Sequence, residues 1–171
     1  VLRVGNFFSN RGWYYSDLEL DDKYYCNKGD LLYAWSASFG PKIWDEGKVI
    51  YHYHIWKISI DERLVDKKYL LYALEQDVES IKREQGSGST MIHVTKSAME
   101  QRLIPLPPLT EQKRIAAILD KADAIRRKRQ QAIQLADDFL RSVFLDMFGD
   151  PVTNPKGWEE STLEQIAHKI T

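Results

Sequence analysis

A stretch of about 40 residues between Pro108 and Gly149 contains neither proline nor glycine, and it limits how this chain folds more than any other feature. Both residue types interrupt helices, so their absence allows one continuous helix. Thr110 has the chemistry of an N-cap, and Glu111 would place a carboxylate in the first turn, where it complements the helix dipole. We therefore predict a helix over residues 110–149, roughly 60 Å long.

The predicted helix carries an apolar stripe along its length. Its positions recur at spacings of three and four residues, which is typical of a coiled-coil seam. They are Ile115, Ile118, Ala122, Ile125, Arg129, Ala132, Ala136, Phe139 and Val143. Arg129 interrupts the apolar repeat, and polar residues at such positions commonly set the register of helix pairing. The stripe is too long to be buried by a small domain, so we expect a coiled coil with a second helix outside this sequence or with another copy of the chain.

Residues 1–109 show the pattern of an α+β domain. Up to Ile60, short runs with a period of two residues alternate with turn sequences, which indicates antiparallel strands. The clearest runs lie at residues 2–4, 31–35 and 55–60. We predict a curled, mostly antiparallel β-sheet.

A helix should pack on this sheet. Asp66 is a suitable N-cap, and the apolar residues that follow share one helical face that ends near Glu84. Short strands are expected at 91–94 and 102–106, before the prolines at 105–108 end regular structure. We place the domain boundary after residue 109.

Residues 150–171 are turn-rich and too few to hold a core, so we expect a linker and the start of a second domain. The sequence begins without methionine and stops within an amphipathic pattern. We expect both ends to be truncated, including the N-terminus of the domain at 1–109.

The overall charge gives no independent sign of a nucleic-acid binder. The chain has 24 basic and 25 acidic residues and a net charge of −1, so DNA affinity would have to come from local clusters or from a partner subunit. Cys26 is the only cysteine, which excludes an internal disulfide and a multi-cysteine zinc site and fits a reducing compartment. The sequence has neither a membrane-length apolar run nor a signal sequence, and we expect a cytoplasmic protein.

Two loops have the chemistry to contact DNA. One is a small-residue turn flanked by tryptophans, whose hydroxyl and ammonium groups suit a base edge or a phosphate. The other is a Gly-Ser loop followed by a lysine, which suits phosphate contact. The candidates are Ser36, Ser38, Lys42, Ser87, Ser89, Thr90 and Lys96. A β-turn lined by core aromatics explains the first loop equally well, and a plain linker explains the second.

Three further patterns each have a simpler explanation. Glu111 and Lys113 have the carboxylate–lysine spacing of metal-dependent nucleases, but the start of a helix favours a capping role for Glu111. His52 and His54 would face the same side of a β-type run, but no third metal ligand is evident, so we expect no metal. The four basic residues at 126–129 form a belt around the helix that is either solvated or in contact with a DNA backbone or an acidic partner.

Several segments together resemble the specificity (S) subunits of type I restriction-modification systems. They are Leu-Leu-Tyr-Ala-Trp-Ser at 31–36 followed by Phe39 and Gly40, Gly-Ser-Thr at 88–90, Ile-Pro-Leu-Pro-Pro-Leu-Thr-Glu-Gln at 104–112 with Ile115, and Met-Phe-Gly-Asp-Pro at 147–151 through Gly157 and Trp158. The proline-rich segment is the most specific. It is similar to the junction between a target-recognition domain and the spacer helix of that family.

The resemblance implies a protein with no catalysis of its own. In that family two target-recognition domains each read one half of a split DNA site, while the conserved helices pair antiparallel and dock the modification subunits. It thus implies double-stranded DNA and the modification and restriction subunits as partners, and no cofactor on this chain, because S-adenosylmethionine binds the partner subunits. No membrane is expected as a partner, since the sequence has no membrane-length apolar run. Two alternatives stay open: a helical dimerisation or adaptor module without DNA binding, and a metal-dependent nuclease that uses Glu111 and Lys113.

Overall fold

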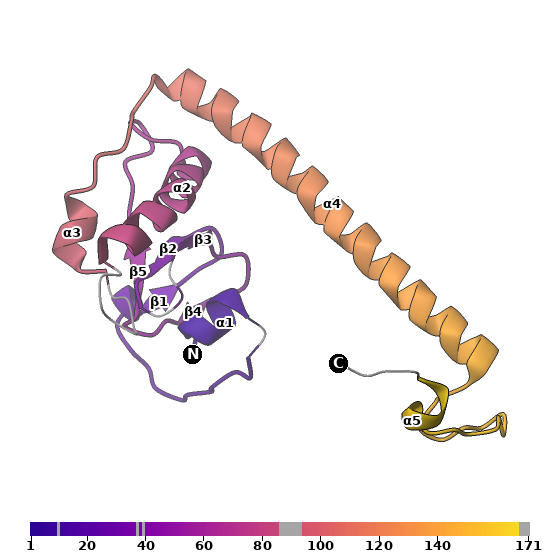
Figure 1. Cartoon of the computed structure of the whole chain (residues 1–171). Coiled ribbons are helices and arrows are strands. Elements are labelled where there is room, and N and C mark those ends of the chain that lie inside the picture. Colours follow the sequence, from indigo (N-terminus) through magenta and orange to yellow (C-terminus); the bar gives the residue numbers. More distant parts are fainter. Residues whose placement is uncertain (10, 37, 39, 86–93, 168–171) are drawn as a thin grey trace. The chain divides into compact units, whose positions relative to one another are not determined.

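The computed structural model describes residues 1–9, 11–36, 38, 40–85 and 94–167. Contacts divide the chain into an N-terminal unit, Val1–Asp120, and a C-terminal unit, Lys121–Thr171. Within the described residues, the N-terminal unit holds antiparallel sheets and the helices that pack on them (Figure 1). The predicted α+β class with a long helix is therefore confirmed. None of the helices in the described part of the chain has the length and hydropathy that a membrane span needs.

The larger sheet is built around β2 (Leu31–Ala34). This strand pairs antiparallel with β3 (Gly40–Ile43) on one side and with β5 (Ile55–Ile58) on the other. The smaller sheet pairs β1 (Tyr25–Cys26) with β4 (Val49–Ile50), also antiparallel. All four residues of β2 are buried, which requires that both faces of the larger sheet are covered.

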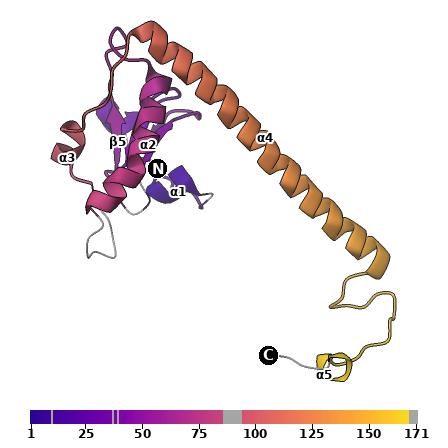
Figure 2. The same ribbon diagram turned by 45° about the horizontal axis from the view of Figure 1, so that its top comes forward.

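The side chains of β2 alternate between two cores. Leu31 and Tyr33 pack against α2 (Lys67–Gln85), which lies across the sheet in Figures 1 and 2. Leu32 and Ala34 point to the opposite face. There they pack with Leu2, Phe7, Cys26, Trp44 and Ile55.

The start of α2 follows the predicted cap. The Asp66 carboxylate accepts hydrogen bonds from the backbone N–H groups of Lys68 (3.1 Å) and Tyr69 (3.0 Å). An acceptor at this position satisfies N–H groups that the first helical turn leaves without partners. The helix ends at Gln85, one residue beyond the predicted end.

The strand predicted at 102–106 is wrong. After α3 (Lys96–Glu100) this segment has no regular secondary structure. It is held against α2 by side chains instead, because Arg102 forms an ion pair with Asp77 and the Tyr69 hydroxyl donates to the Pro105 carbonyl at 2.7 Å. Of the other predicted strand, 91–93 lies outside the described residues.

The N-terminal strand predicted at 2–4 is also wrong beyond its first residue. Leu2 makes a single bridge to Tyr51, and a short helix, α1 (Val4–Phe8), follows. The helix buries Phe7 in the core, and this tertiary contact outweighs the local β pattern. A coil segment and a short 3-10 turn, η1 (Asp22–Tyr24), then lead into β1.

The long helix α4 runs from Leu109 to Phe148, a length of 40 residues, and so confirms the predicted helix. Its start differs in one respect. The Pro108 carbonyl accepts hydrogen bonds from the N–H groups of Glu111 (2.8 Å) and Gln112 (3.0 Å). The cap is therefore Pro108, and Thr110 lies inside the first turn.

The end of α4 is closed by the loop that follows it. Gly149 adopts a left-handed conformation (φ 80°), and its N–H donates to the Leu145 carbonyl at 2.9 Å. The Lys156 ammonium donates to the Met147 carbonyl (2.8 Å), and the Trp158 indole donates to the Phe148 carbonyl (3.1 Å). These donors satisfy carbonyls that the last helical turn leaves open. A single-turn helix, α5 (Leu163–Ile166), comes after this loop.

Candidate nucleic-acid interface

The first group of predicted DNA contacts lies near the turn between β2 and β3. Ser36 is 3% exposed, so it lies in the core and not on the surface expected for a DNA contact. Ser38 is exposed. Lys42 on β3 is partly exposed, with its ammonium 3.9 Å from the Asp45 carboxylate and 5.7 Å from the centre of the Trp44 ring. Contact of Ser38 and Lys42 with DNA stays a prediction.

The second predicted group is covered only in part. Ser87, Ser89 and Thr90 lie outside the described residues. Lys96, the first residue of α3, is exposed and lies 3.5 Å from the Glu100 carboxylate. Exposed pairs of this kind hold their partners weakly, so the Lys96 ammonium is accessible to a ligand. Its contact with DNA stays a prediction.

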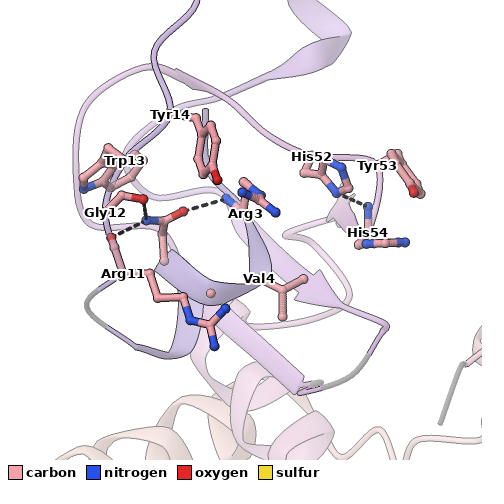
Figure 3. A pocket seen from close by; sticks show the side chains of 11 residues that line it. Arg3, Val4, Arg11, Gly12, Trp13, Tyr14, His52, Tyr53 and His54 are labelled. Atoms are coloured by element: carbon pink, nitrogen blue, oxygen red, sulfur yellow. Dashed lines mark hydrogen bonds between the residues drawn. The ribbon is translucent and has the colours of Figure 1, made fainter. Parts of the chain in front are cut away.

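A hollow of about 760 Å³ that the sequence did not indicate opens on the N-terminal unit (Figure 3). We call it the basic hollow. Its cationic and aromatic lining consists of Arg3, Arg11, His52, His54, Trp13, Tyr14 and Tyr53. None of the described residues that line it carries a carboxylate. In a chain with 24 basic and 25 acidic residues, this is a local surplus of positive charge.

Backbone pairing brings the two sides of the basic hollow together. The N–H of Leu2 donates to the Ile50 carbonyl at 2.7 Å, and the N–H of His52 donates to the Leu2 carbonyl at 2.8 Å. This bridge places Arg3 beside His52, although they are far apart in the sequence. Figure 3 shows the Arg3 side chain between Tyr14 and His52. The sequence signal was limited to arginines interleaved with aromatics near the N-terminus.

On the opposite side of the basic hollow, Gly5 and Asn6 position the segment that begins at Arg11. A β-carbon on Gly5 would lie 2.7 Å from the Arg11 δ-carbon, so the absence of a side chain at Gly5 makes room for Arg11. The Asn6 side-chain NH₂ donates to the carbonyls of Arg11 (2.7 Å) and Gly12 (3.3 Å). Asn6 therefore fixes the segment that carries Arg11, Trp13 and Tyr14.

The two histidines lie in a turn before β5 and not in a strand as predicted, but the turn still brings their rings together, with centroids 4.8 Å apart. The backbone N–H of His54 donates to Nδ1 of His52 at 3.4 Å, so neutral His52 carries its proton on Nε2. Burial first, and then the charges of His54 and Arg3, lower the pKa of His52 from its ordinary value. The positive charges of these neighbours thus disfavour the protonated, cationic form of His52.

The first three turns of α4 belong to the N-terminal unit and bind it through one face. Gln112 is 0% exposed. Its Oε1 accepts from the Asp66 N–H at 2.8 Å, and its Nε2 donates to the carbonyls of Leu64 (3.0 Å) and Pro107 (2.8 Å). Farther along this face Ala116 is buried. The sequence did not predict this anchor, because a glutamine carries no apolar signal.

Asp120 continues the anchored face. Its carboxylate forms an ion pair with Lys68 and accepts a hydrogen bond from the Tyr72 hydroxyl at 2.7 Å. Both partners lie on α2. The anchored face of α4 is thus polar at each end and joins the long helix to the helix that covers the sheet.

The predicted pairing stripe lies on a different face. At about 100° per residue, Ile118 and Ile125 lie roughly 160° to 180° around the helix from Ala116. Ile118, Ala122, Ile125, Arg129, Ala132, Ala136 and Phe139 are exposed, whereas Ile115 and Val143 are half-buried. The large side chains are open to solvent, with exposures of 52% at Ile118 and 67% at Phe139. Pairing through this stripe stays a prediction.

Glu111, the carboxylate of the nuclease alternative, is paired within the helix. The Glu111 carboxylate pairs with Arg114 at 2.6 Å, and this hydrogen bond lowers the pKa of Glu111. Across the described residues, no three His, Cys, Asp or Glu side chains form a group that could hold a metal ion. In the basic belt at 126–129, Arg126 and Arg127 pair with Asp123.

Comparison with known proteins decides the family. The model of the type I restriction modification DNA specificity domain matches residues 1–135. The chain belongs to this family. The resemblance found in the sequence is therefore confirmed, and the match covers the described sheets, α2 and most of α4.

Two relatives with the name of a type I specificity subunit support the same family. The type I restriction enzyme MjaVIII specificity subunit of Methanocaldococcus jannaschii is 30% identical over 140 residues, which cover 82% of this chain and 33% of the relative. The type I restriction enzyme EcoBI specificity subunit of Escherichia coli is 28% identical over 138 residues, 78% of this chain and 29% of the relative. This chain thus spans about a third of the length of these relatives.

Proposed function

We propose that the chain is the part of a type I specificity subunit that recognises one half of a split DNA site. The observation that carries this proposal is the family match over residues 1–135. The N-terminal unit supplies the recognition surface, and no membrane is involved. Such a protein acts in the cytoplasm, where the DNA that it recognises is found.

The chain contributes recognition and no catalysis in this proposal. Modification subunits bring S-adenosylmethionine and the methyl transfer, and restriction subunits bring cleavage. Support comes from Glu111, which lies in the first turn of α4 and pairs with Arg114, as expected of a residue that stabilises the start of the helix.

Helix α4 acts as spacer and pairing element. Its stripe of exposed apolar side chains is the support, because such a stripe is stabilised by burial against another helix. That helix comes from the remainder of the subunit or, for this chain by itself, from a second copy.

A domain exchange tests the proposal. Residues 1–108 of the complete subunit are replaced by the matching segment of a relative with another target, and the complex with modification subunits is expressed in cells. Sequencing of methylated DNA should show a change in one half of the methylated site, with the other half and the spacing retained. An unchanged site would refute DNA recognition by the N-terminal unit and leave the adaptor alternative, which α4 by itself would satisfy.

A further inference from the structure

The basic hollow combines features that a polyanion ligand requires, and nothing described so far gives it a role. Arg3 and Arg11 line it without a carboxylate partner among the described residues. Most other cations of the N-terminal unit differ in this respect: Lys23, Lys48, Lys57, Arg63, Lys67 and Lys68, for example, each lie within ion-pair distance of an Asp or Glu. The two arginines thus keep their charge available for a ligand.

We propose that the basic hollow binds phosphates of the backbone of duplex DNA, with Arg3 and Arg11 as the contacting side chains. The assignment rests on the proposed function, since it names where the recognition unit holds the sugar-phosphate strand. Phosphate contacts of this kind position a protein on DNA without reading its sequence.

The environment of Arg3 suits a phosphate. Its guanidinium carbon lies over the Tyr14 ring, 4.3 Å from the ring centre. This cation–π contact holds the guanidinium in the basic hollow without neutralising its charge. A guanidinium can donate to phosphate oxygens in pairs, which makes arginine well suited to this ligand.

The hollow is preorganised for Arg11 as well. Gly5 leaves space for the Arg11 side chain, and Asn6 holds the backbone of Arg11 by a 2.7 Å hydrogen bond. Neutral His52 adds an N–H donor at Nε2 on the opposite side. Donors that are fixed before binding lose less conformational entropy when the ligand arrives.

A continuous strand fits better than a single small anion. A second hollow of about 320 Å³ shares Asn6, Arg11 and Trp13 with the basic hollow and also has Lys42 in its lining. Arg11 thus lines both hollows, Arg3 only the first and Lys42 only the second, so these cations extend beyond the area that a single phosphate covers. Glu46 also lines the second hollow, so the charge is most favourable around Arg3 and Arg11.

The test is the salt dependence of binding to a duplex of random sequence, measured with the complete subunit in complex with its modification subunits. Each phosphate contact that is lost lowers the slope of log K against log salt by about one. We expect the variant R3Q/R11Q to lower the slope by about two and to weaken binding to every duplex alike. The charge-preserving variant R3K/R11K should keep most of the slope.

R63Q is the matched control, because Arg63 is an exposed arginine of the same unit outside the hollow. It should leave the slope unchanged. If R3Q/R11Q melts at the same temperature as the parent and shows the same slope of log K against log salt, the basic hollow does not bind phosphates. The proposed function would remain intact in that case. A parent complex without any salt-dependent binding would instead overturn the proposed function. Replacement of chloride by inorganic phosphate at constant ionic strength should not displace the duplex, and displacement would assign the hollow to a free anion.

Discussion

The substitution Gln112→Leu removes the anchor of α4 while keeping a side chain of similar volume. Three hydrogen bonds are lost, from the Asp66 N–H and to the carbonyls of Leu64 and Pro107. A buried hydrogen bond contributes about 1 kcal/mol net. The free energy of unfolding of the N-terminal unit should therefore fall by about 3 kcal/mol, because all three part-buried hydrogen bonds of the Gln112 side chain are lost together.

Urea unfolding followed by tryptophan fluorescence measures this loss, because Trp13, Trp35, Trp44 and Trp56 all lie in the N-terminal unit. Gln130→Leu makes the same change at an exposed position of α4 and should alter stability by less than about 0.5 kcal/mol.

Gln112→Glu tests the direction of the hydrogen bonds. A carboxylate can accept from the Asp66 N–H, but it faces the two carbonyl oxygens without a proton to donate. Its pKa in the folded state should rise above the unfolded value, so the variant should be least stable at neutral pH and recover as pH falls towards about 4. If Gln112→Leu unfolds at the parental urea concentration, the reasoning that this amide anchors the helix is refuted.

Four further predictions address other parts of the chain. Arg3→Gln should raise the pKa of His52 in an NMR titration, but only in part, because burial is the largest cause of its lowering; an unchanged pKa would show that the two groups do not interact. Ile125→Asp should reduce association through α4 in sedimentation experiments while leaving the urea midpoint of the N-terminal unit unchanged, and undiminished association would exclude the stripe as the pairing surface. Gly149→Ala should destabilise the end of α4 by about 1 kcal/mol, because φ there is 80° and a β-carbon would lie 2.9 Å from a proline ring, and a neutral effect on helix melting would contradict this. Burial raises the pKa of Cys26 to about 11, so thiol reagents should label it at pH 8 only after unfolding, and rapid labelling of the native protein would count against a buried thiol.

Local chemistry made part of the fold predictable. The absence of proline and glycine located α4 to within one residue at each end, and the carboxylate of Asp66 marked the start of α2. The failures have a common cause in contacts distant along the chain. Leu2 pairs with Tyr51, which converts a predicted strand into a bridge followed by a helix.

The candidate site was predicted less well for the same reason. Of the predicted small-residue turn, Lys42 lies on β3 and burial removes Ser36 from the surface. The basic hollow depends on the Leu2–Tyr51 bridge and on Asn6, and neither contact has a signature in sequence periodicity. Gln112 was named in the family motif, yet its role as a buried anchor needs the partners that only the fold supplies.

The anchored face and the exposed stripe of α4 lie on different sides of the helix, and this separation has an evolutionary consequence. Gln112 and Ala116 attach the helix to the N-terminal unit, whereas Ile118 and Ile125 lie on another side of it. Mutations that alter the sheet and its loops can therefore accumulate without touching the exposed apolar side chains. Under the proposed function, a lineage would change which DNA it reads while the same helical surface stays available to its partner.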